Sequence, residues 1–347
     1  MPLDAIVVPT GRDAAHVRCA VELGANIGVP TVLMCSADSV PRDAAAVAEA
    51  VPRADCTVVD LRKPVEIEDW PDLLTAEFSE AMMGSHKDLA FKRNLGLVLG
   101  RTAGWTAILF LDDDIVDLVP DRVLRATGSL EHHTVVGMRA TQFPDNSVVC
   151  HARRLAGGRQ GVFVSGSALA VRVDLADALF PETYNEDWLF LAPHLARREV
   201  VAVWTVRQRP FNPFRMRHRA ASEEFGDVLG EGLIGSLHRG TLSAALSPAY
   251  WRSFLDLRAR FLAQTLDRCR ASNDPRAAAA IPALAAAEQV RGRIPPDVLS
   301  DYVAAWKTDL RVWRRYLSGI VPTGDLPSAL KRLGLPVWST SHTPSPC

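Results

Sequence analysis

The sequence has few of the features that would identify a specialised class of protein. Its six cysteines include no Cys-x-x-Cys pair, so neither a zinc site nor a disulfide framework is indicated. No apolar run approaches the roughly eighteen residues of a membrane span, and the amino terminus has no basic segment followed by a long apolar stretch. Thirty-nine basic and forty acidic residues leave a formal charge of -1, which gives no overall attraction to nucleic acid or an anionic membrane. We expect a cytoplasmic protein with reduced cysteines and with no nucleic-acid or membrane partner.

The composition that remains is that of an ordinary globular protein. Hydrophobic residues make up 48% of the 347 residues and charged residues 23%, which argues against a disordered or fibrous chain. At about 150 residues per domain, this length suits one large domain or a domain with a sizeable appendage.

Short apolar strands alternate with helices over residues 1–115. The strands are expected at residues 5–8, 31–35, 56–61 and 106–111, and the helices at 14–26, 42–50, 73–83 and 86–99. Strands that are apolar along their whole length are typical of a parallel sheet buried on both faces. This part therefore predicts α/β architecture.

The remainder of the chain is less regular and then becomes helical. Strands are expected at 134–139, 147–151, 162–171 and 200–206, with a helix at 186–197 and further helices at 250–270, 276–289 and 296–317. Tyr302, Trp306 and Trp313 share one face of the last helix, which indicates a core position or, alternatively, a surface for an acceptor or a second copy in a homodimer. The fold expected is a mixed central sheet flanked by helices over 1–240, with parts at 1–115 and 116–240. A helical extension would follow at 241–335, and a turn-rich, flexible tail at 336–347.

Three aspartates end the strand at 106–111. Asp112, Asp113 and Asp114 concentrate negative charge, which a divalent cation such as Mg²⁺ or Mn²⁺ would relieve. Alternation along the chain points Asp112 and Asp114 to one side and Asp113 to the other. The alternative is an exposed acidic turn that caps the next helix.

Other segments of unusual composition occur in a fixed order around this triplet. Lys92-Arg93-Asn94-Leu95-Gly96 precedes it, while Ser165-Gly166-Ser167 and Asn185-Glu186-Asp187-Trp188 follow. The segment 207–219 holds five arginines, His218 and no acid, so it would repel itself unless an anion sits in it. A solvated basic loop is the alternative there, and a capped helix start is the alternative at Glu186 and Asp187.

Over about residues 1–220, these segments together resemble a nucleotide-sugar-dependent glycosyltransferase of the GT-A fold, family 2-like, with Asp112-Asp113-Asp114 as its DxD motif. The resemblance implies a metal-dependent enzyme that moves a sugar from a nucleoside-diphosphate sugar to an acceptor. It places Asp187, or else Glu186, as the base of an inverting reaction. It also implies that the part at 1–115 binds the donor and that 116–240 binds the acceptor.

The resemblance further implies a set of binding residues. Those expected at the donor nucleotide are Pro9, Thr10, Arg12, Asp38, Lys92, Arg93, Asn94, Asp112 and Asp113. Those expected at the diphosphate are Arg215, Arg217 and Arg219, and those at the acceptor are Ser165, Gly166, Ser167 and Trp188. The cation, Mn²⁺ or Mg²⁺, would be held by Asp112, Asp114 and His218.

Two other enzyme classes fit parts of the pattern. Asp112 to Val116 also matches the nucleophile motif of haloacid-dehalogenase-like phosphatases, but the downstream lysine they need could only be Lys307 or Lys331. A sugar-phosphate nucleotidyltransferase would need a Gly-rich opening loop with an early lysine. A nucleotide-sugar-binding protein on an inactive scaffold would not need all the acidic residues that the resemblance implies.

We expect a glycosyltransferase that acts on a small soluble acceptor, because no membrane helix or basic amphipathic stretch suggests a lipid-linked acceptor.

Overall fold

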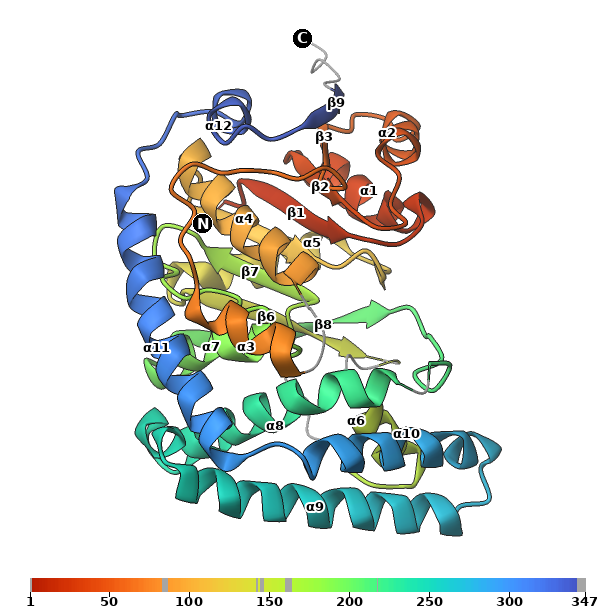
Figure 1. Ribbon diagram of the computed structural model, residues 1–347. Helices are drawn as coiled ribbons and strands as arrows, with labels where there is room; N and C mark the ends of the chain where they lie inside the picture. Colours follow the sequence, from red (N-terminus) through yellow and green to blue (C-terminus); the bar gives the residue numbers. More distant parts are fainter. Residues whose placement is uncertain are drawn as a thin grey trace.

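The computed structural model describes residues 2–82, 87–141, 143, 147–159, 164–216 and 218–341. Its described strands form one nine-stranded mixed sheet in the order β5-β8-β6-β7-β4-β1-β2-β3-β9, flanked by helices (Figure 1). The strands are β1 (Ala5–Thr10), β2 (Thr31–Cys35), β3 (Cys56–Asp60), β4 (Ala107–Leu111), β5 (Ile115–Val116), β6 (Val135–Thr141), β7 (Ala168–Arg172), β8 (Val200–Gln208) and β9 (Val337–Ser341). The helices are α1 (Arg18–Ile27), α2 (Pro41–Glu49), α3 (Leu74–Met82), α4 (Lys87–Ala103), α5 (Pro120–Gly128), α6 (Val148–Leu155), α7 (Glu186–Ala196), α8 (Arg219–His238), α9 (Pro248–Ala271), α10 (Pro275–Arg291), α11 (Pro296–Gly319) and α12 (Leu326–Arg332).

The first half of the sheet is parallel, as predicted. β1 pairs in parallel with both β2 and β4, and β2 pairs in parallel with β3. Side chains of β1 alternate between two cores, because Val7 belongs to the cluster under α4 and α7 while Ile6 and Val8 belong to the cluster under α1 and α2. Burial on both faces is why these strands are apolar throughout.

The second half of the sheet is mixed. β7 runs antiparallel to β4 and to β6, whereas β6 and β8 are parallel. The strand predicted at 147–151 is wrong, because this segment lies in helix α6 and the side chain of Ser147 caps that helix by accepting from the Cys150 N–H. Val148, Val149 and Ala152 recur at helical spacing and pack in the helical region. The strand predicted at 162–171 is shorter, beginning at Ala168, and residues 162 and 163 lie outside the described part.

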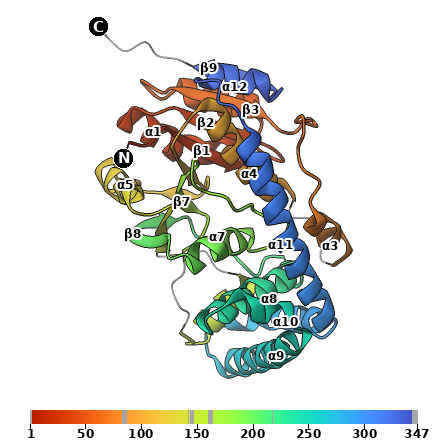
Figure 2. The same ribbon diagram turned by 90° about the vertical axis from the view of Figure 1, so that its left-hand side faces the viewer.

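The helical C-terminal region, α8 to α12, lies beside the sheet, and α11 runs along one edge of the molecule to connect the two (Figures 1 and 2). Tyr302, Trp306 and Trp313 are fully buried, which confirms that the aromatic stripe is core and leaves it unavailable to a second copy. Asp309, also on α11, accepts hydrogen bonds at 2.9 Å from the backbone N–H groups of Leu74 and Thr75 at the start of α3. The helical region is therefore tied to α3, in the N-terminal part of the chain.

The last described strand returns the chain to its beginning. β9 pairs antiparallel with β3, so that Ser341 lies opposite Cys56 and Thr340 opposite Thr57. The flexible tail predicted at 336–347 is therefore wrong for residues 337–341, whose turn-rich composition does not indicate a strand, and residues 342–347 lie outside the described part.

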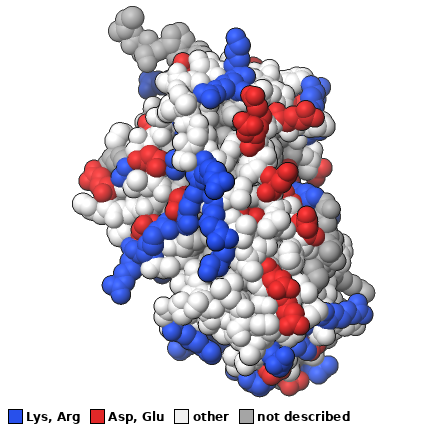
Figure 3. Space-filling view, turned by 60° about the vertical axis from the view of Figure 1, so that its left-hand side comes forward, with Lys and Arg blue, Asp and Glu red and all other residues white. Residues whose placement is uncertain are grey.

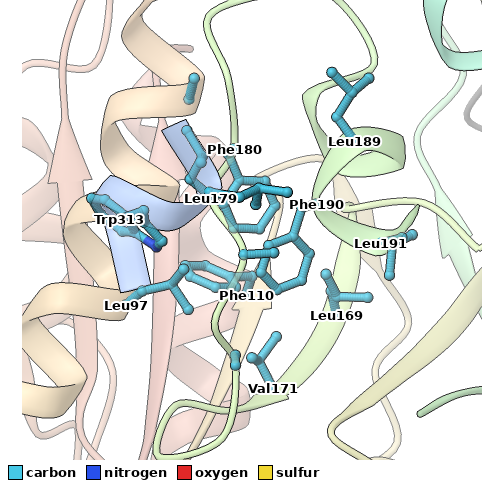
Figure 4. Packing of buried hydrophobic residues seen from close by; sticks show 14 of the residues in the cluster. Leu97, Phe110, Leu169, Val171, Leu179, Phe180, Leu189, Phe190, Leu191 and Trp313 are labelled. Carbon is cyan, nitrogen blue, oxygen red and sulfur yellow. The ribbon is translucent and has the colours of Figure 1, made fainter. Parts of the chain in front are cut away.

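A stack of phenylalanines fixes the parts of the fold that carry the candidate site. Phe110 on β4 contacts Phe180 edge-to-face at 5.8 Å between ring centroids, and Phe180 stacks on Phe190 of α7 at 4.1 Å (Figure 4). Such aromatic pairs add about 0.5–1.5 kcal/mol each beyond the area they bury. The stack therefore holds the end of β4 in a fixed position relative to the start of α7.

The surface near α11 carries many basic side chains, which gather in the middle of the face seen in Figure 3. Two arginines, Arg197 and Arg314, share one acidic partner, because both bind Asp177 at 2.8 Å. Among the helices of the described residues, none is both long and apolar enough to cross a membrane.

Candidate functional site

A polar cleft lies between the carboxyl end of β4 and helix α8, with a cavity volume of about 500 Å³. In an open α/β sheet, this end of the strands is where ligands bind. The predicted residues that line the cleft are Arg12, Arg93, Asp112, Asp114, Ser165, Glu186, Asp187, Trp188 and Arg219. Ten other predicted site residues lie within the described part of the chain but do not line the cleft: Pro9, Thr10, Asp38, Lys92, Asn94, Asp113, Gly166, Ser167, Arg215 and His218.

The aspartate triplet alternates as predicted. Asp112 and Asp114 line the cleft, whereas Asp113 turns away and accepts a hydrogen bond of 2.8 Å from the Thr10 hydroxyl. Arg12 binds Asp113 and also reaches Asp114, with 3.1 Å between its Nη2 and Asp114 Oδ2. The guanidinium thus offsets part of the negative charge that the three neighbouring carboxylates concentrate.

Arg93 connects the two groups of acids in the cleft. Its Nη2 donates to Asp112 Oδ1 at 3.0 Å, and its Nη1 binds Glu186. Burial alone would lower the pKa of Arg93, but Asp112, Glu186 and Asp187 raise it above the usual value. A Cβ atom at residue 166 would lie 2.2 Å from Nη1, so only glycine leaves room for this guanidinium.

Glu186 and Asp187 begin helix α7. Asn185 precedes them in the left-handed conformation, with φ of 61°, and Asp187 accepts from the backbone N–H groups of Gly166 at 2.6 Å and Trp188 at 2.8 Å. Capping a helix and lining the cleft are therefore compatible roles for Asp187.

Burial changes the protonation of these acids. It raises the pKa of Glu186 to about 8 and that of Asp112 to about 6, although Arg93 opposes both shifts. Burial also raises the pKa of Asp187, against the effect of Arg93 and of the two N–H groups. Carboxyl groups with a pKa near neutrality can take up and release protons under physiological conditions.

Lys92 and Asn94 hold loops of the protein together. The Lys92 ammonium is buried and donates to the Thr10 carbonyl at 2.8 Å, to Ser36 Oγ at 2.5 Å and to Asp88 Oδ2 at 2.7 Å. The Asn94 amide donates to the Phe180 carbonyl at 2.7 Å and accepts from the Phe180 N–H at 2.8 Å. Both side chains thus shape the loops around the cleft without lining it.

The basic loop contributes one of its predicted arginines to the cleft. Arg219 pairs with Glu223 at 2.6 Å, and its guanidinium lies 4.7 Å from the centre of the Phe211 ring. Arg215 and His218 are exposed and outside the cleft lining, and Arg217 lies outside the described residues. Asp38 is exposed as well, with its N–H donating to the Gly11 carbonyl at 3.1 Å.

The acidic wall of the cleft opposite the aspartates was not predicted from the sequence. Glu223, Asp227 and Glu231 line it at intervals of four residues, which places them on one face of α8. Burial raises the pKa of Glu223 to about 7, although Arg219 opposes this. The repeated spacing of these acids was a signal that could have identified the wall.

The residues at the triplet fit a hard divalent cation. The carboxylates of Asp112 and Asp114 and the amide of Gln208 line the same cleft, and oxygen ligands of this kind are those that Mg²⁺ and Mn²⁺ prefer. Across the described residues, no three His, Cys, Asp or Glu side chains are grouped so that they alone could hold a metal. Mg²⁺ sites commonly use one or two carboxylates and complete their coordination with water or with phosphates of a bound ligand.

No protein-family model matches the sequence, and no curated protein matches it significantly.

Proposed function

We propose that this chain is a GT-A-like, metal-dependent glycosyltransferase that moves a sugar from a nucleoside-diphosphate sugar to a small soluble acceptor. One observation carries the proposal: a single cleft joins Asp112 and Asp114, at the end of a buried strand, to the buried pair Glu186 and Asp187. Arg93 connects the two groups from the helix before that strand. The mixed sheet flanked by helices agrees with the fold that the sequence resemblance implies.

In the proposed reaction, the bond between the anomeric carbon and the diphosphate oxygen breaks, and its electron pair leaves with the nucleoside diphosphate. A new bond forms between the anomeric carbon and a heteroatom of the acceptor. In an inverting reaction, Asp187 or Glu186 takes the acceptor's proton, and the raised pKa of each makes it a stronger base than an ordinary carboxylate. A divalent cation bound by Asp112 and Asp114 would neutralise charge on the departing diphosphate.

The size and lining of the cleft support a small, polar acceptor. A volume of about 500 Å³ is in the range of small-molecule sites, and the lining combines carboxylates with Trp188 and Phe211.

Free cysteines at positions 19, 35, 56, 150 and 269 support our proposal of a cytoplasmic location.

The phosphatase alternative receives less support. Lys307 on α11 and Lys331 on α12 are both exposed, and neither lines the cleft that holds Asp112. No described residue in the cleft lining is a lysine, so the partner that a phosphoryl nucleophile needs is not at hand.

Thermal shift and transfer assays test the proposal. UDP, GDP or TDP with Mn²⁺ should raise the melting temperature of the wild-type protein, because a ligand that binds only the folded state stabilises it. Asp114→Ala should abolish both this rise and metal-dependent sugar transfer, whereas Asp121→Ala, at an exposed acid on α5, should change neither. Full metal-dependent transfer by Asp114→Ala, or hydrolysis of a generic phosphate ester by the wild type, would overturn the proposal.

A further inference from the structure

Gln208 lies beside the aspartate triplet because of the way β8 pairs with β5. In this antiparallel pair, Gln208 is opposite Ile115, the residue that follows Asp114. The backbone N–H of Arg209 donates to the Asp114 carbonyl at 2.8 Å, which extends the pairing by one residue. The position of Gln208 relative to Asp114 is therefore set by the sheet.

The amide of Gln208 is fixed at one end and unsatisfied at the other. Its Nε2 donates to Asp114 Oδ2 at 3.1 Å, and this bond determines which way the amide is oriented. The Oε1 atom is buried and has no hydrogen-bond partner within the described part of the chain, and the residue as a whole is only 4% exposed. Buried amide oxygens are nearly always paired in folded proteins, so an unpaired one at a cleft points to a ligand.

We propose that Gln208 supplies a neutral oxygen ligand to the divalent cation held at Asp114. This inference rests on the cation-dependent function proposed above. An amide carbonyl is a hard oxygen ligand of the kind that Mg²⁺ and Mn²⁺ accept, and Gln208 lines the same cleft as both Asp112 and Asp114. It takes the place that the family resemblance implied for His218, which is exposed and outside the cleft lining.

Charge supports a neutral ligand at this position. Asp112, Asp113 and Asp114 already bring three carboxylates to this end of β4, and the two arginines Arg12 and Arg93 offset only part of their charge. An amide coordinates the cation without adding a further negative charge that would have to be balanced when the cation leaves. The Arg12 side chain that pairs with Asp114 is half-exposed to solvent.

Calorimetric titration with Mn²⁺, alone and with UDP, GDP or TDP, tests this assignment without relying on catalysis. Gln208→Met removes the oxygen at similar volume and should weaken Mn²⁺ binding at least tenfold. Gln208→Glu restores an oxygen and should bind Mn²⁺ within threefold of wild type or more tightly. Gln289→Met, at an exposed glutamine on α10, is the matched control and should bind as wild type does.

The outcomes separate this inference from the function on which it rests. If Asp114→Ala loses Mn²⁺ while Gln208→Met binds it normally, Gln208 is not a ligand, although the cation site stands. If Gln208→Met takes up Mn²⁺ normally but shows a raised KM for the sugar nucleotide, its oxygen meets a substrate hydroxyl and the inference also fails. If the wild type takes up no Mn²⁺ in any titration, both proposals fail. Melting temperatures without cation establish folding, and Gln208→Asn, which retracts the amide by one methylene, replaces the Met variant if that variant does not fold.

Discussion

Arg258 allows a quantitative test of the acidic wall of the cleft. From α9, its guanidinium donates to both carboxylate oxygens of Glu224, at 2.8 and 2.7 Å, and also to Asp227 at 2.8 Å and Glu231 at 2.9 Å. Arg258 is 2% exposed, and Glu224 is fully buried. Replacing Arg258 with Met keeps most of the apolar volume but leaves these carboxylates without their cation.

The expected cost follows from the burial of the pair. Removing one partner of a buried ion pair costs about 3–5 kcal/mol, because the other charge stays buried and uncompensated. For a chain of 347 residues that unfolds in one step, this loss corresponds to a fall in melting temperature of roughly 4–7 °C. Arg260→Met, at an exposed position of the same helix, is the matched control and should stay within about 0.5 kcal/mol of wild type.

The stability lost in Arg258→Met should increase with pH. Burial already raises the pKa of Glu224 from 4.5 to about 7 and also raises that of Glu231, and in both residues Arg258 opposes the shift. Without Arg258 both pKa values rise further, so the folded state binds more protons than the unfolded state and stability falls as pH increases through the folded pKa. Urea unfolding should show the largest loss at about pH 8 and a smaller one at about pH 5. A loss below about 1 kcal/mol at pH 8, or a larger loss at pH 5, would refute the reasoning.

Three further changes test other parts of the structure. Gly166→Ala should displace Arg93, since its Cβ would lie 2.2 Å from the guanidinium, and lower kcat/KM for sugar transfer at least tenfold; unchanged kinetics would contradict this arrangement. Asp309→Ala should lower the free energy of unfolding, measured in urea, by about 2–3 kcal/mol, because it removes a buried carboxylate that accepts three hydrogen bonds at the start of α3. Asp309→Asn should lower it by less. If Glu186 is the base, kcat/KM should rise with pH until its pKa near 8 is passed, and the profile of Glu186→Gln should be flat over that range. A wild-type profile already level above pH 6 would assign the proton to another group.

The parallel half of the fold could be predicted from local sequence alone. Its strands are apolar over their full length because both faces are covered, so the pattern needs no knowledge of distant partners. Helix α6 was missed because Val148 and Val149 are β-branched and read as a strand in a short window. The side-chain cap at Ser147 and the helical spacing of the apolar residues Val148, Val149 and Ala152 favour a helix instead.

Site residues could be predicted where charged residues cluster in the sequence. They could not be predicted where tertiary contacts determine whether a side chain faces the cleft. Asp112 and Asp114 end an apolar strand, which makes them conspicuous, and they do line the cleft. Lys92 looked equally suited to a ligand, but its ammonium donates to Thr10, Ser36 and Asp88 within the protein. Gln208 gave no signal, because a neutral residue in a strand becomes noticeable only when the structure places an unpaired oxygen beside Asp114.

The pairing of β9 with β3 has a consequence for how the protein is made. Ser341 hydrogen-bonds to Cys56, which lies 285 positions earlier in the chain. At about 5–20 residues per second of translation, β3 waits roughly 15–60 s before its outer neighbour leaves the ribosome. During that time one border of the nascent sheet offers its free N–H and C=O groups to any other extended segment. A chain truncated before β9 would therefore be prone to aggregate through that border.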